Sequence, residues 1–232
     1  MTLSDPLAHP AWTSLTGEHR RFAESRGRAV RYRTDVAPFI ALPPDPGRED
    51  WADLAALAGA GTVVPLTGLV GPPPEHWPVV QRGAGVQLSG ERIVGAADPE
   101  AVLLTEADVP EMLALVERTK PGPFRARTIE LGRYLGIRRD GVLIAMAGER
   151  LHPPGWTEIS AVCTDAAHRG QGLGTRLVLA VAAGIRERDE VPFLHASADN
   201  ANAIRLYESL GFRLSRRVEF TFLEVPADVP VG

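Results

Sequence analysis

Cysteine is almost absent from this chain, in which Cys163 is the only one among 232 residues. A single thiol excludes an intramolecular disulfide, so the core alone must stabilise the fold, and a reducing cytoplasm is the expected location. Histidine is also sparse, and His9, His19, His76 and His152 do not have the spacing of metal ligands. We therefore expect no bound metal.

Long hydrophobic runs are missing as well. The longest, Leu177–Ile185, contains a glycine and is far shorter than the ~20 residues that a membrane helix needs. Met1–Pro6 lacks the basic and apolar regions of a signal peptide. A formal net charge of −4 provides no positive excess for nucleic acid or an anionic membrane. The sequence predicts a globular protein without either partner, and leaves open whether it is a monomer or a homodimer.

Proline is abundant in the first hundred residues, where it favours short elements and frequent turns. Helical spacing predicts a helix through Trp12, Leu15, His19 and Phe22 that ends at Gly27. The other predicted elements here are a helix at Asp50–Leu57 and strands at Ala29–Tyr32, Thr62–Leu66, Val79–Gln81 and Gly85–Leu88. We interpret residues 1–97 as a small N-terminal α/β domain of unknown role.

Regular alternation of strands and helices begins after Gly95–Pro99, which we interpret as the join to a second domain, residues 98–232. The turn Asp140-Gly141 between two strand-like runs is a strong hairpin signal. The predicted elements are strands at 102–104, 134–138, 142–150, 157–164, 193–197 and 218–225, with helices at 106–119, from the glycine-rich loop to 188, and at 200–210. The order βαββ followed by βαβαβ predicts an α/β fold.

The strongest chemical signal is the glycine-rich run His168–Thr175, between a predicted strand and a predicted helix. Its three glycines allow backbone N–H groups to close around an anion without Cβ atoms in the way. The following helix adds unpaired N–H groups and the positive end of its dipole. The run therefore suits a phosphate group, although a tight turn without a ligand has the same composition.

Two common phosphate-binding fingerprints do not fit this run. A dinucleotide motif starting at Gly170 requires a glycine where Thr175 stands, and a P-loop requires a lysine that is missing here. Instead, Arg169-x-x-Gly172-x-Gly174 resembles the pyrophosphate motif of the GNAT superfamily, the acyl-CoA-dependent N-acyltransferases. The segment Asn200–Phe212 resembles the second motif of the same superfamily, N-x-x-A-x-x-L-Y-x-x-x-G-F. The resemblance covers residues 100–225 and does not extend to residues 1–97.

This resemblance implies a GNAT fold, in which a mixed but mostly antiparallel sheet with flanking helices splays apart between its fourth and fifth strands. Acetyl-CoA would enter as co-substrate, with its pantetheine arm between those strands. The implied contacts to pantetheine are backbone groups of Val162, Cys163 and Thr164. The implied contacts to the pyrophosphate are Arg169, Gly170, Gln171, Gly172, Leu173, Gly174 and Thr175. Asn200 and, less strongly, Asn202 would also contact the cofactor.

The resemblance also places catalytic groups. Tyr207 stands where the family has a general acid that protonates the leaving thiolate. Glu158 and His195 occupy positions of two alternative general bases, although many members use a chain of water molecules. Each residue has a structural interpretation too: core packing for Tyr207, a solvated strand edge for Glu158 and a hydrogen-bonded core position for His195. Asn200 is also a good helix N-cap, and lone cysteines on strands such as Cys163 are usually inert.

The implied activity is N-acetyl transfer to a primary amine by direct attack in a ternary complex. The acceptor would be a small-molecule amine, an amino acid or a peptide, and an alternative is a protein N-terminal or lysine acetyltransferase. A different class is an acyl-CoA-binding module that has lost catalysis. In this family the loop corresponding to Lys120–Arg133 selects the acceptor. Arg125, Arg127 and Arg133 in that loop favour a carboxylated acceptor or simply form a solvated basic surface.

Overall fold

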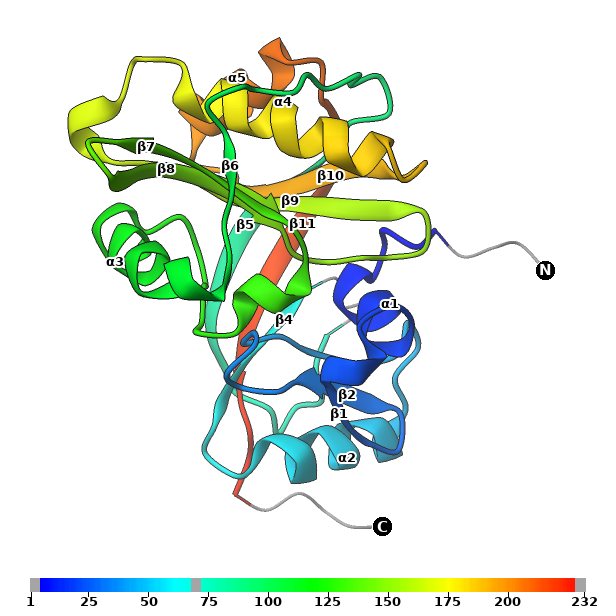
Figure 1. Cartoon of the computed structure of the whole chain (residues 1–232). Coiled ribbons are helices and arrows are strands. Elements are labelled where there is room, and N and C mark those ends of the chain that lie inside the picture. Colours follow the sequence, from blue (N-terminus) through cyan, green and yellow to red (C-terminus); the bar gives the residue numbers. More distant parts are fainter. Residues whose placement is uncertain (1–4, 68–71, 228–232) are drawn as a thin grey trace.

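Eight strands from both ends of the chain form one large sheet, in the order β4-β11-β5-β10-β9-β8-β7-β6 (Figure 1). The computed structural model describes residues 5–67 and 72–227. Residues 1–4, part of the segment on which the signal-peptide expectation rests, lie outside the described residues. The strands are β4 (Val63–Thr67), β5 (Val79–Ser89), β6 (Val102–Leu103), β7 (Tyr134–Arg139), β8 (Val142–Glu149), β9 (Trp156–Thr164), β10 (Val191–Ser197) and β11 (Arg213–Glu224).

The sheet is mixed because β9 and β10 are parallel, whereas all other neighbours are antiparallel. These two strands pair only where Val191–Phe193 lies beside Trp156–Glu158. Both continue beyond that point, to Thr164 and Ser197, without further pairing to each other. The predicted splay between the fourth and fifth strands of the GNAT fold is thus confirmed.

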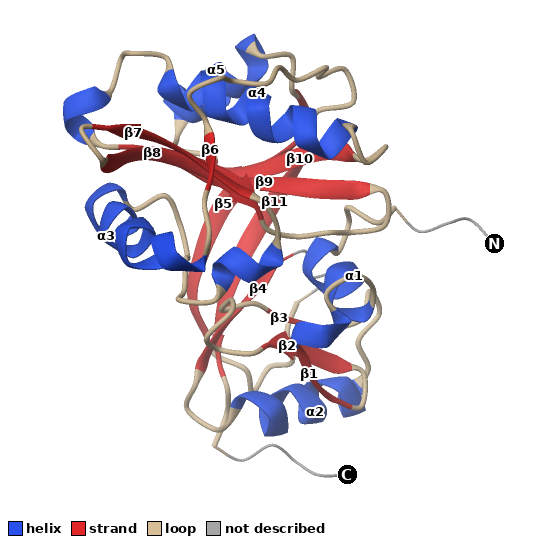
Figure 2. Ribbon diagram, in the orientation of Figure 1, coloured by secondary structure: helices blue, strands red, loops and turns tan. Residues whose placement is uncertain are grey.

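Helices cover both faces of the large sheet (Figures 1 and 2). On one face lie α4 (Leu173–Arg186) and α5 (Ala201–Ser209), whose apolar sides join the main core cluster. On the other face lies α3 (Val109–Thr119), which packs through Met112 and Leu115. Short 3-10 helices are η2 (Glu106–Asp108), η3 (Thr128–Leu131) and η4 (Ala166–His168). None of the helices in the described part of the chain is long and apolar enough to cross a membrane.

The first sixty residues add a three-stranded sheet and two helices next to the large sheet (Figure 1). Their elements are α1 (Pro10–Thr16), η1 (Arg20–Phe22), β1 (Ala23–Arg26), β2 (Ala29–Tyr32), β3 (Ile40–Ala41) and α2 (Arg48–Ala58). The predicted helix through Phe22 to Gly27 is wrong, because α1 ends at Thr16. Leu15 and Phe22 nevertheless enter the same cluster of buried side chains. A helix followed by a turn buries these two residues as effectively as one continuous helix.

Strands β5 and β11 are longer than the sequence predicts, and β11 begins at Arg213 instead of residue 218. The runs Val79–Gln81 and Gly85–Leu88 form a single strand, β5, which lies between β10 and β11. A Cβ atom on Gly85 would come within 2.4 Å of the Phe220 ring, so only glycine accommodates this ring. Gly85 therefore marks the place where an aromatic side chain lies across the strand.

The N-terminal residues pack tightly against the rest of the chain. Leu7 and Tyr32 share a buried cluster with Leu131 and Phe193. The backbone N–H of His152 donates to Ser14 Oγ at 2.9 Å, and Thr128 Oγ1 donates to the Val36 carbonyl at 2.6 Å. The N-terminal residues therefore pack on the later part of the chain. The division at residue 97 stays a prediction, since β4 and β5 lie in the same sheet as the later strands.

Candidate active site

The slot between β9 and β10 begins where their pairing ends, at Glu158. Ala161 in β9 has a φ of 53°, and the register of β9 with β8 shifts there, between Met146 and Gly148. A non-glycine residue in this conformation marks a bulge, a feature that is frequent beside functional sites. The bulge immediately precedes Val162–Thr164, the residues whose backbone the sequence places against pantetheine.

Cys163 lies in this slot region, but its side chain is buried in the core. Burial raises the pKa of its thiol above the usual value, so the thiol stays protonated near neutral pH. A protonated, buried thiol is a poor nucleophile. This agrees with the interpretation of Cys163 as inert.

The glycine-rich loop ends at the N-terminus of α4, beside β9. Gly170 and Gly172 have φ values of 78° and 73°, and a Cβ atom on either would meet nothing within 4 Å. Gly172 is the N-cap of α4 and supplies no side-chain cap, so the N–H groups of the first turn are left available. Gly174 lies next to the slot, since its nearest neighbour would be Val162 Cγ1 at 3.9 Å. The loop is thus open at the mouth of the slot, with a geometry that suits an anion.

The side chains of this loop differ in their surroundings. Arg169 and Gln171 are exposed, Thr175 is half-buried, and Leu173 is buried in the main core cluster. Leu173 can therefore contribute only its backbone N–H to a ligand. Arg169 Nε lies 3.4 Å from the carbonyl oxygen of Thr164, a long contact that leaves its guanidinium able to turn towards a phosphate.

The second motif forms α5 with the caps that its sequence predicts. Asn200 is the N-cap, and its Oδ1 accepts from the backbone N–H of Ala203 at 3.1 Å. Asn202 is exposed, and its Oδ1 accepts from the Arg205 guanidinium. Gly211, with a φ of 100°, ends the helix, and the N–H of Phe212 donates to the Tyr207 carbonyl at 3.0 Å. The N-cap role of Asn200 is confirmed, and its contact with a cofactor stays a prediction.

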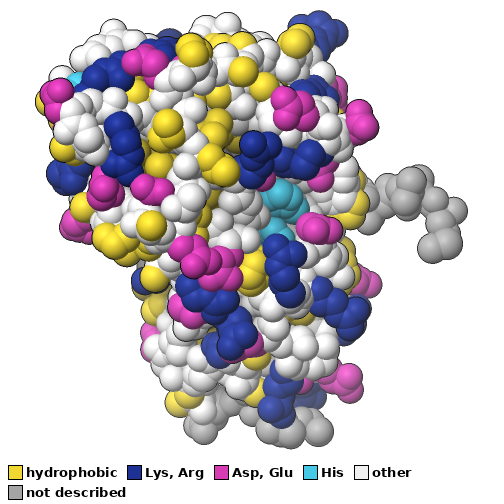
Figure 3. Space-filling view, viewed as in Figure 1, with side chains coloured by type: hydrophobic (Ala, Val, Ile, Leu, Met, Phe, Trp, Pro, Cys, Tyr) yellow, Lys and Arg dark blue, Asp and Glu magenta, His cyan; other side chains and the backbone are white. Residues whose placement is uncertain are grey.

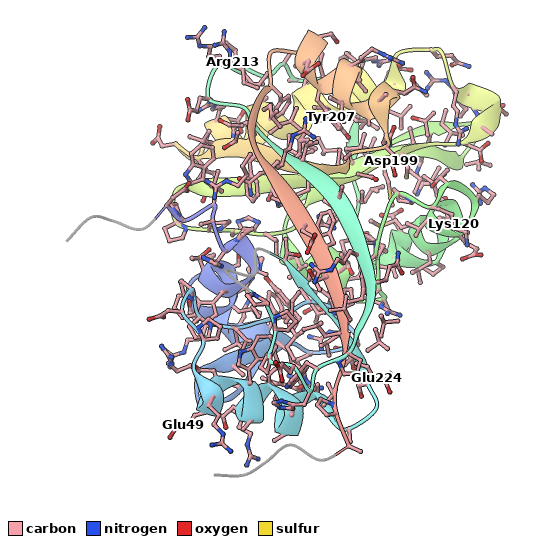
Figure 4. All side chains as sticks on the ribbon, turned by 180° about the vertical axis from the view of Figure 1, so that it is seen from behind. Glu49, Lys120, Asp199, Tyr207, Arg213 and Glu224 are labelled. Carbon is pink, nitrogen blue, oxygen red and sulfur yellow. The ribbon has the colours of Figure 1, made fainter. Side chains whose placement is uncertain are left out.

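Tyr207 extends from α5 into the core between α4, α5 and the sheet, and Figure 4 shows it from behind. It is 8% exposed, and its hydroxyl has no hydrogen-bond partner among the described residues. Burial raises its pKa to about 12. The hydroxyl therefore keeps its proton at physiological pH and is available to donate it.

Glu158 is completely buried at the start of the slot. Its Oε2 accepts from Arg150 Nε at 2.8 Å, and its Oε1 accepts from the Arg150 guanidinium at 2.7 Å and faces His195 Nδ1 at 2.6 Å. Burial alone would raise the pKa of Glu158, but Arg150 and His195 outweigh burial and lower it to about 2. The alternative of a solvated strand-edge glutamate is wrong: the carboxylate is a buried, ionised partner of Arg150.

His195 lies between the rings of Phe193 and Phe220, whose centroids are 5.7 and 6.3 Å from its own. Its Nδ1 faces Glu158, and its Nε2 lies 3.1 Å from Gln87 Nε2. The structure therefore brings Glu158 and His195 into direct contact. It places them on the sheet face that carries Phe193, whereas Tyr207 packs with Leu194 on the opposite face. The candidate acid and bases thus approach the slot from opposite faces.

Sequence reasoning missed two members of this cluster, Arg150 and Gln87. Arg150 could have been found from the sequence, because a hairpin with its turn at Pro153–Gly155 places Arg150 beside Glu158. In the structure, the backbone N–H of Arg150 donates to the Glu158 carbonyl at 3.0 Å. Gln87 had none, since β5 reaches β10 only through the tertiary fold. In the described residues, no three His, Cys, Asp or Glu side chains are grouped so as to hold a metal ion.

Comparisons with known proteins bear on this site. The family described as FR47-like protein matches residues 134–221, which include the glycine-rich loop and most of β11. A crystal structure from Novosphingobium aromaticivorans, of a protein assigned to the GNAT family of acetyltransferases, is 41% identical with a TM-score of 0.86. That match covers 95% of this chain and 99% of the other, so it includes the N-terminal residues.

Two curated relatives are similar over shorter stretches. The mycothiol acetyltransferase of Brachybacterium faecium is 36% identical over 128 residues, which are 53% of this chain and 35% of that protein. The N-alpha-acetyltransferase RimI of Mycobacterium tuberculosis is 36% identical over 88 residues, which are 34% of this chain and 51% of that protein. The matches thus span about a third to a half of the length of these two relatives.

Proposed function

The chain belongs to the GNAT superfamily of acyltransferases, and we propose that it transfers an acetyl group from acetyl-CoA to a primary amine within a ternary complex. The observation that carries this proposal is the open glycine-rich N-terminus of α4 at the mouth of the β9–β10 slot. The loop suits a pyrophosphate. Beyond the point where β9 and β10 stop pairing with each other, the backbone groups on their facing edges are available to bind the amides of a pantetheine arm.

In the proposed complex, backbone groups of Val162–Thr164 bind the pantetheine amides, and N–H groups of residues 170–175 bind the pyrophosphate. Hydrogen bonds to charged oxygens contribute roughly 1.5–3 kcal/mol each. A few such bonds therefore suffice for micromolar affinity. Arg169 adds a mobile positive charge at the same place, and Asn200 and Asn202 lie at the N-terminus of α5, where the cofactor would pass.

CoA and acetyl-CoA are expected to raise the melting temperature of the protein, whereas NAD and ATP are not. The reason is that a ligand which binds only the folded state stabilises it, and the loop departs from both nucleotide fingerprints. Thermal denaturation at equal ligand concentrations measures this directly. An equal shift with NAD would contradict the cofactor assignment, and release of free thiol from acetyl-CoA in the presence of mixed amines tests the reaction itself.

For the chemistry, we propose that Tyr207 protonates the departing thiolate and that the Glu158–His195 pair receives the proton of the amine. An amine with a pKa near 10 is mostly protonated at pH 7 and must lose a proton before it attacks. The pKa of Glu158, about 2, makes this carboxylate a weak base. His195 is therefore the member of the pair to which we assign the proton: Glu158 orients the ring through Nδ1, and Nε2, which lies 3.1 Å from Gln87 Nε2, would accept the proton once that contact opens.

The pH–rate profile separates the two members. With a folded-state pKa near 2, Glu158 stays ionised above about pH 4, so its own titration cannot cause an acidic limb between pH 5 and 8. We expect His195→Gln to remove that limb and to lower kcat at neutral pH by about 10²-fold, with much of the defect disappearing at high pH, where free amine is abundant. The exposed His76→Gln serves as the matched control and should retain the limb.

Three outcomes distinguish the candidate bases. A normal acidic limb in His195→Gln would contradict the assignment of His195. If Glu158→Gln then removed the limb, Glu158 itself would be the base. If neither variant altered the profile, a chain of water molecules would take the proton.

The acceptor is proposed only as a class: a small-molecule amine, an amino acid or a peptide. Similarity to an N-alpha-acetyltransferase favours a free N-terminus as the second candidate. Arg127 is paired with Glu130 and Asp35, which leaves Arg125 and Arg133, both exposed, as the arginines of the acceptor loop suited to a substrate carboxylate. On the face in Figure 3, Lys and Arg are interspersed with Asp and Glu, so this face does not favour a highly charged macromolecule.

A screen of amines, amino acids and short peptides, with acetylated products detected by mass, would identify the acceptor class. A protein that binds CoA but acetylates nothing would instead support a binding or sensing module. The retained Tyr207 argues against that alternative, since a protein without catalysis does not need a tyrosine hydroxyl there. The cytoplasm remains the proposed location.

A further inference from the structure

Gln87 contacts the candidate base from a strand that precedes the two sequence motifs by about eighty residues. It lies on β5 directly opposite His195 on β10, and its side chain is completely buried. Its Nε2 is 3.1 Å from His195 Nε2 and 3.0 Å from the carbonyl oxygen of Leu7. One amide group thus joins the N-terminal segment to the candidate base.

The carbonyl of Leu7 fixes the orientation of this amide. A carbonyl oxygen only accepts hydrogen bonds, so the side of the amide that faces Leu7 must be its NH2 group. The same NH2 group faces His195 Nε2, which must then be the unprotonated nitrogen that accepts. His195 consequently carries its proton on Nδ1 and donates it to Glu158. Gln87 Oε1 is buried and has no partner among the residues that the structure describes, so the two bonds made by the NH2 group determine the arrangement.

We infer that Gln87 is a positioning residue that keeps His195 in the neutral, Nδ1-protonated tautomer. An imidazolium ring would point a second N–H group at the NH2 group of Gln87, so two donors would face each other. The ionised Glu158 acts in the opposite direction and favours the imidazolium. Without Gln87, His195 would be protonated over a wider pH range, and its Nε2 would then have no free lone pair to accept the proton of the amine at neutral pH.

The other charged groups near His195 are paired with each other or with Glu158. The balance between its neutral and imidazolium forms therefore depends on Gln87 and Glu158. Behind Glu158 lies Arg150, whose guanidinium is paired with the carboxylate. On β11, Arg216 lies opposite Gln87 but is paired with Asp5. The uncharged rings of Phe193 and Phe220 also pack against His195. This inference rests on the proposed function in one respect: the tautomer matters for catalysis only if His195 is the base.

The tautomer can be measured without any substrate. Nitrogen-15 NMR of the full chain, with the His195 signals assigned by their loss in His195→Gln, reports which ring nitrogen carries the proton. We expect a protonated Nδ1 and an unprotonated Nε2 at neutral pH. A ring protonated on Nε2 would overturn the inference, whatever the activity of the protein.

Substitutions of Gln87 test its effect on the charge of the ring. Gln87→Leu removes the opposing donor at similar size, and Gln87→Glu replaces it with a carboxylate that accepts from Nε2–H. We expect the NMR protonation midpoint of His195, and with it the acidic limb of kcat, to move to higher pH by about one unit in Gln87→Leu and further in Gln87→Glu. Gln81→Leu, on an exposed part of the same strand, should leave both unchanged.

The two readouts separate this inference from the proposed function. Midpoints equal to that of the natural protein in both variants would overturn the role of Gln87. A midpoint that moves while the acidic limb stays in place would support that role and would show that His195 is not the base. If one variant fails to fold, the other variant and the tautomer of the natural protein still test the inference.

Discussion

Gly174→Glu is expected to abolish stabilisation by CoA without destabilising the free protein. Gly174 is the second residue of α4, and its φ is not in the left-handed region. A glutamate in the first turn of a helix interacts favourably with the helix dipole, and replacing glycine raises helix propensity. The same carboxylate would lie among the N–H groups proposed for the pyrophosphate. Repulsion between these negative charges should remove binding, which calorimetric titration and thermal denaturation with CoA both measure.

Gly174→Ala is the matched control for this substitution. A Cβ atom at this position would meet Val162 Cγ1 at 3.9 Å, which is an ordinary contact. The alanine variant should therefore fold normally and keep most of its CoA-dependent shift. A retained shift in Gly174→Glu would mean that the phosphates lie elsewhere, whereas equal loss in both variants would mean that bulk rather than charge is responsible.

Local sequence patterns predicted the elements whose hydrogen bonds connect neighbouring residues. The hairpin at Asp140-Gly141 has both turn residues at positive φ, 51° and 81°, as a two-residue hairpin turn of this type requires. Helix α5 has the N-cap and glycine stop that its sequence indicates. Such features depend on residues a few positions apart, so they are visible without knowledge of the tertiary fold.

The elements that the sequence did not predict depend on distant partners. Strand β5 is continuous because Phe220, more than a hundred residues later, lies across Gly85. The predicted helix beyond Thr16 failed because apolar spacing also fits a turn against the same cluster. In the site, the sequence indicated Glu158 and His195 as alternatives, but their contact and the roles of Arg150 and Gln87 arise from pairing between β8, β9, β10 and β5.

Tyr207→Phe is expected to lower kcat by on the order of 10²-fold while the protein keeps its fold and its affinity for acetyl-CoA. The ring packs in the main core cluster with its centroid 6.0 Å from that of Phe212, and phenylalanine preserves that packing. The hydroxyl has no partner among the described residues, so its removal breaks no hydrogen bond there. Stopped-time assays of thiol release at saturating amine give kcat, and denaturation gives stability.

The expected loss lies at the low end for a general acid because a tyrosine with a pKa of about 12 is a weak one. A 10²-fold loss corresponds to about 2.7 kcal/mol of transition-state stabilisation. The KM for acetyl-CoA should change little, since the proton moves only as the thiolate departs. Tyr207→Ala, which leaves a cavity, should lower both kcat and stability. If Tyr207→Phe turned over at the normal rate, the hydroxyl would have no catalytic role, and the retained tyrosine would serve packing alone.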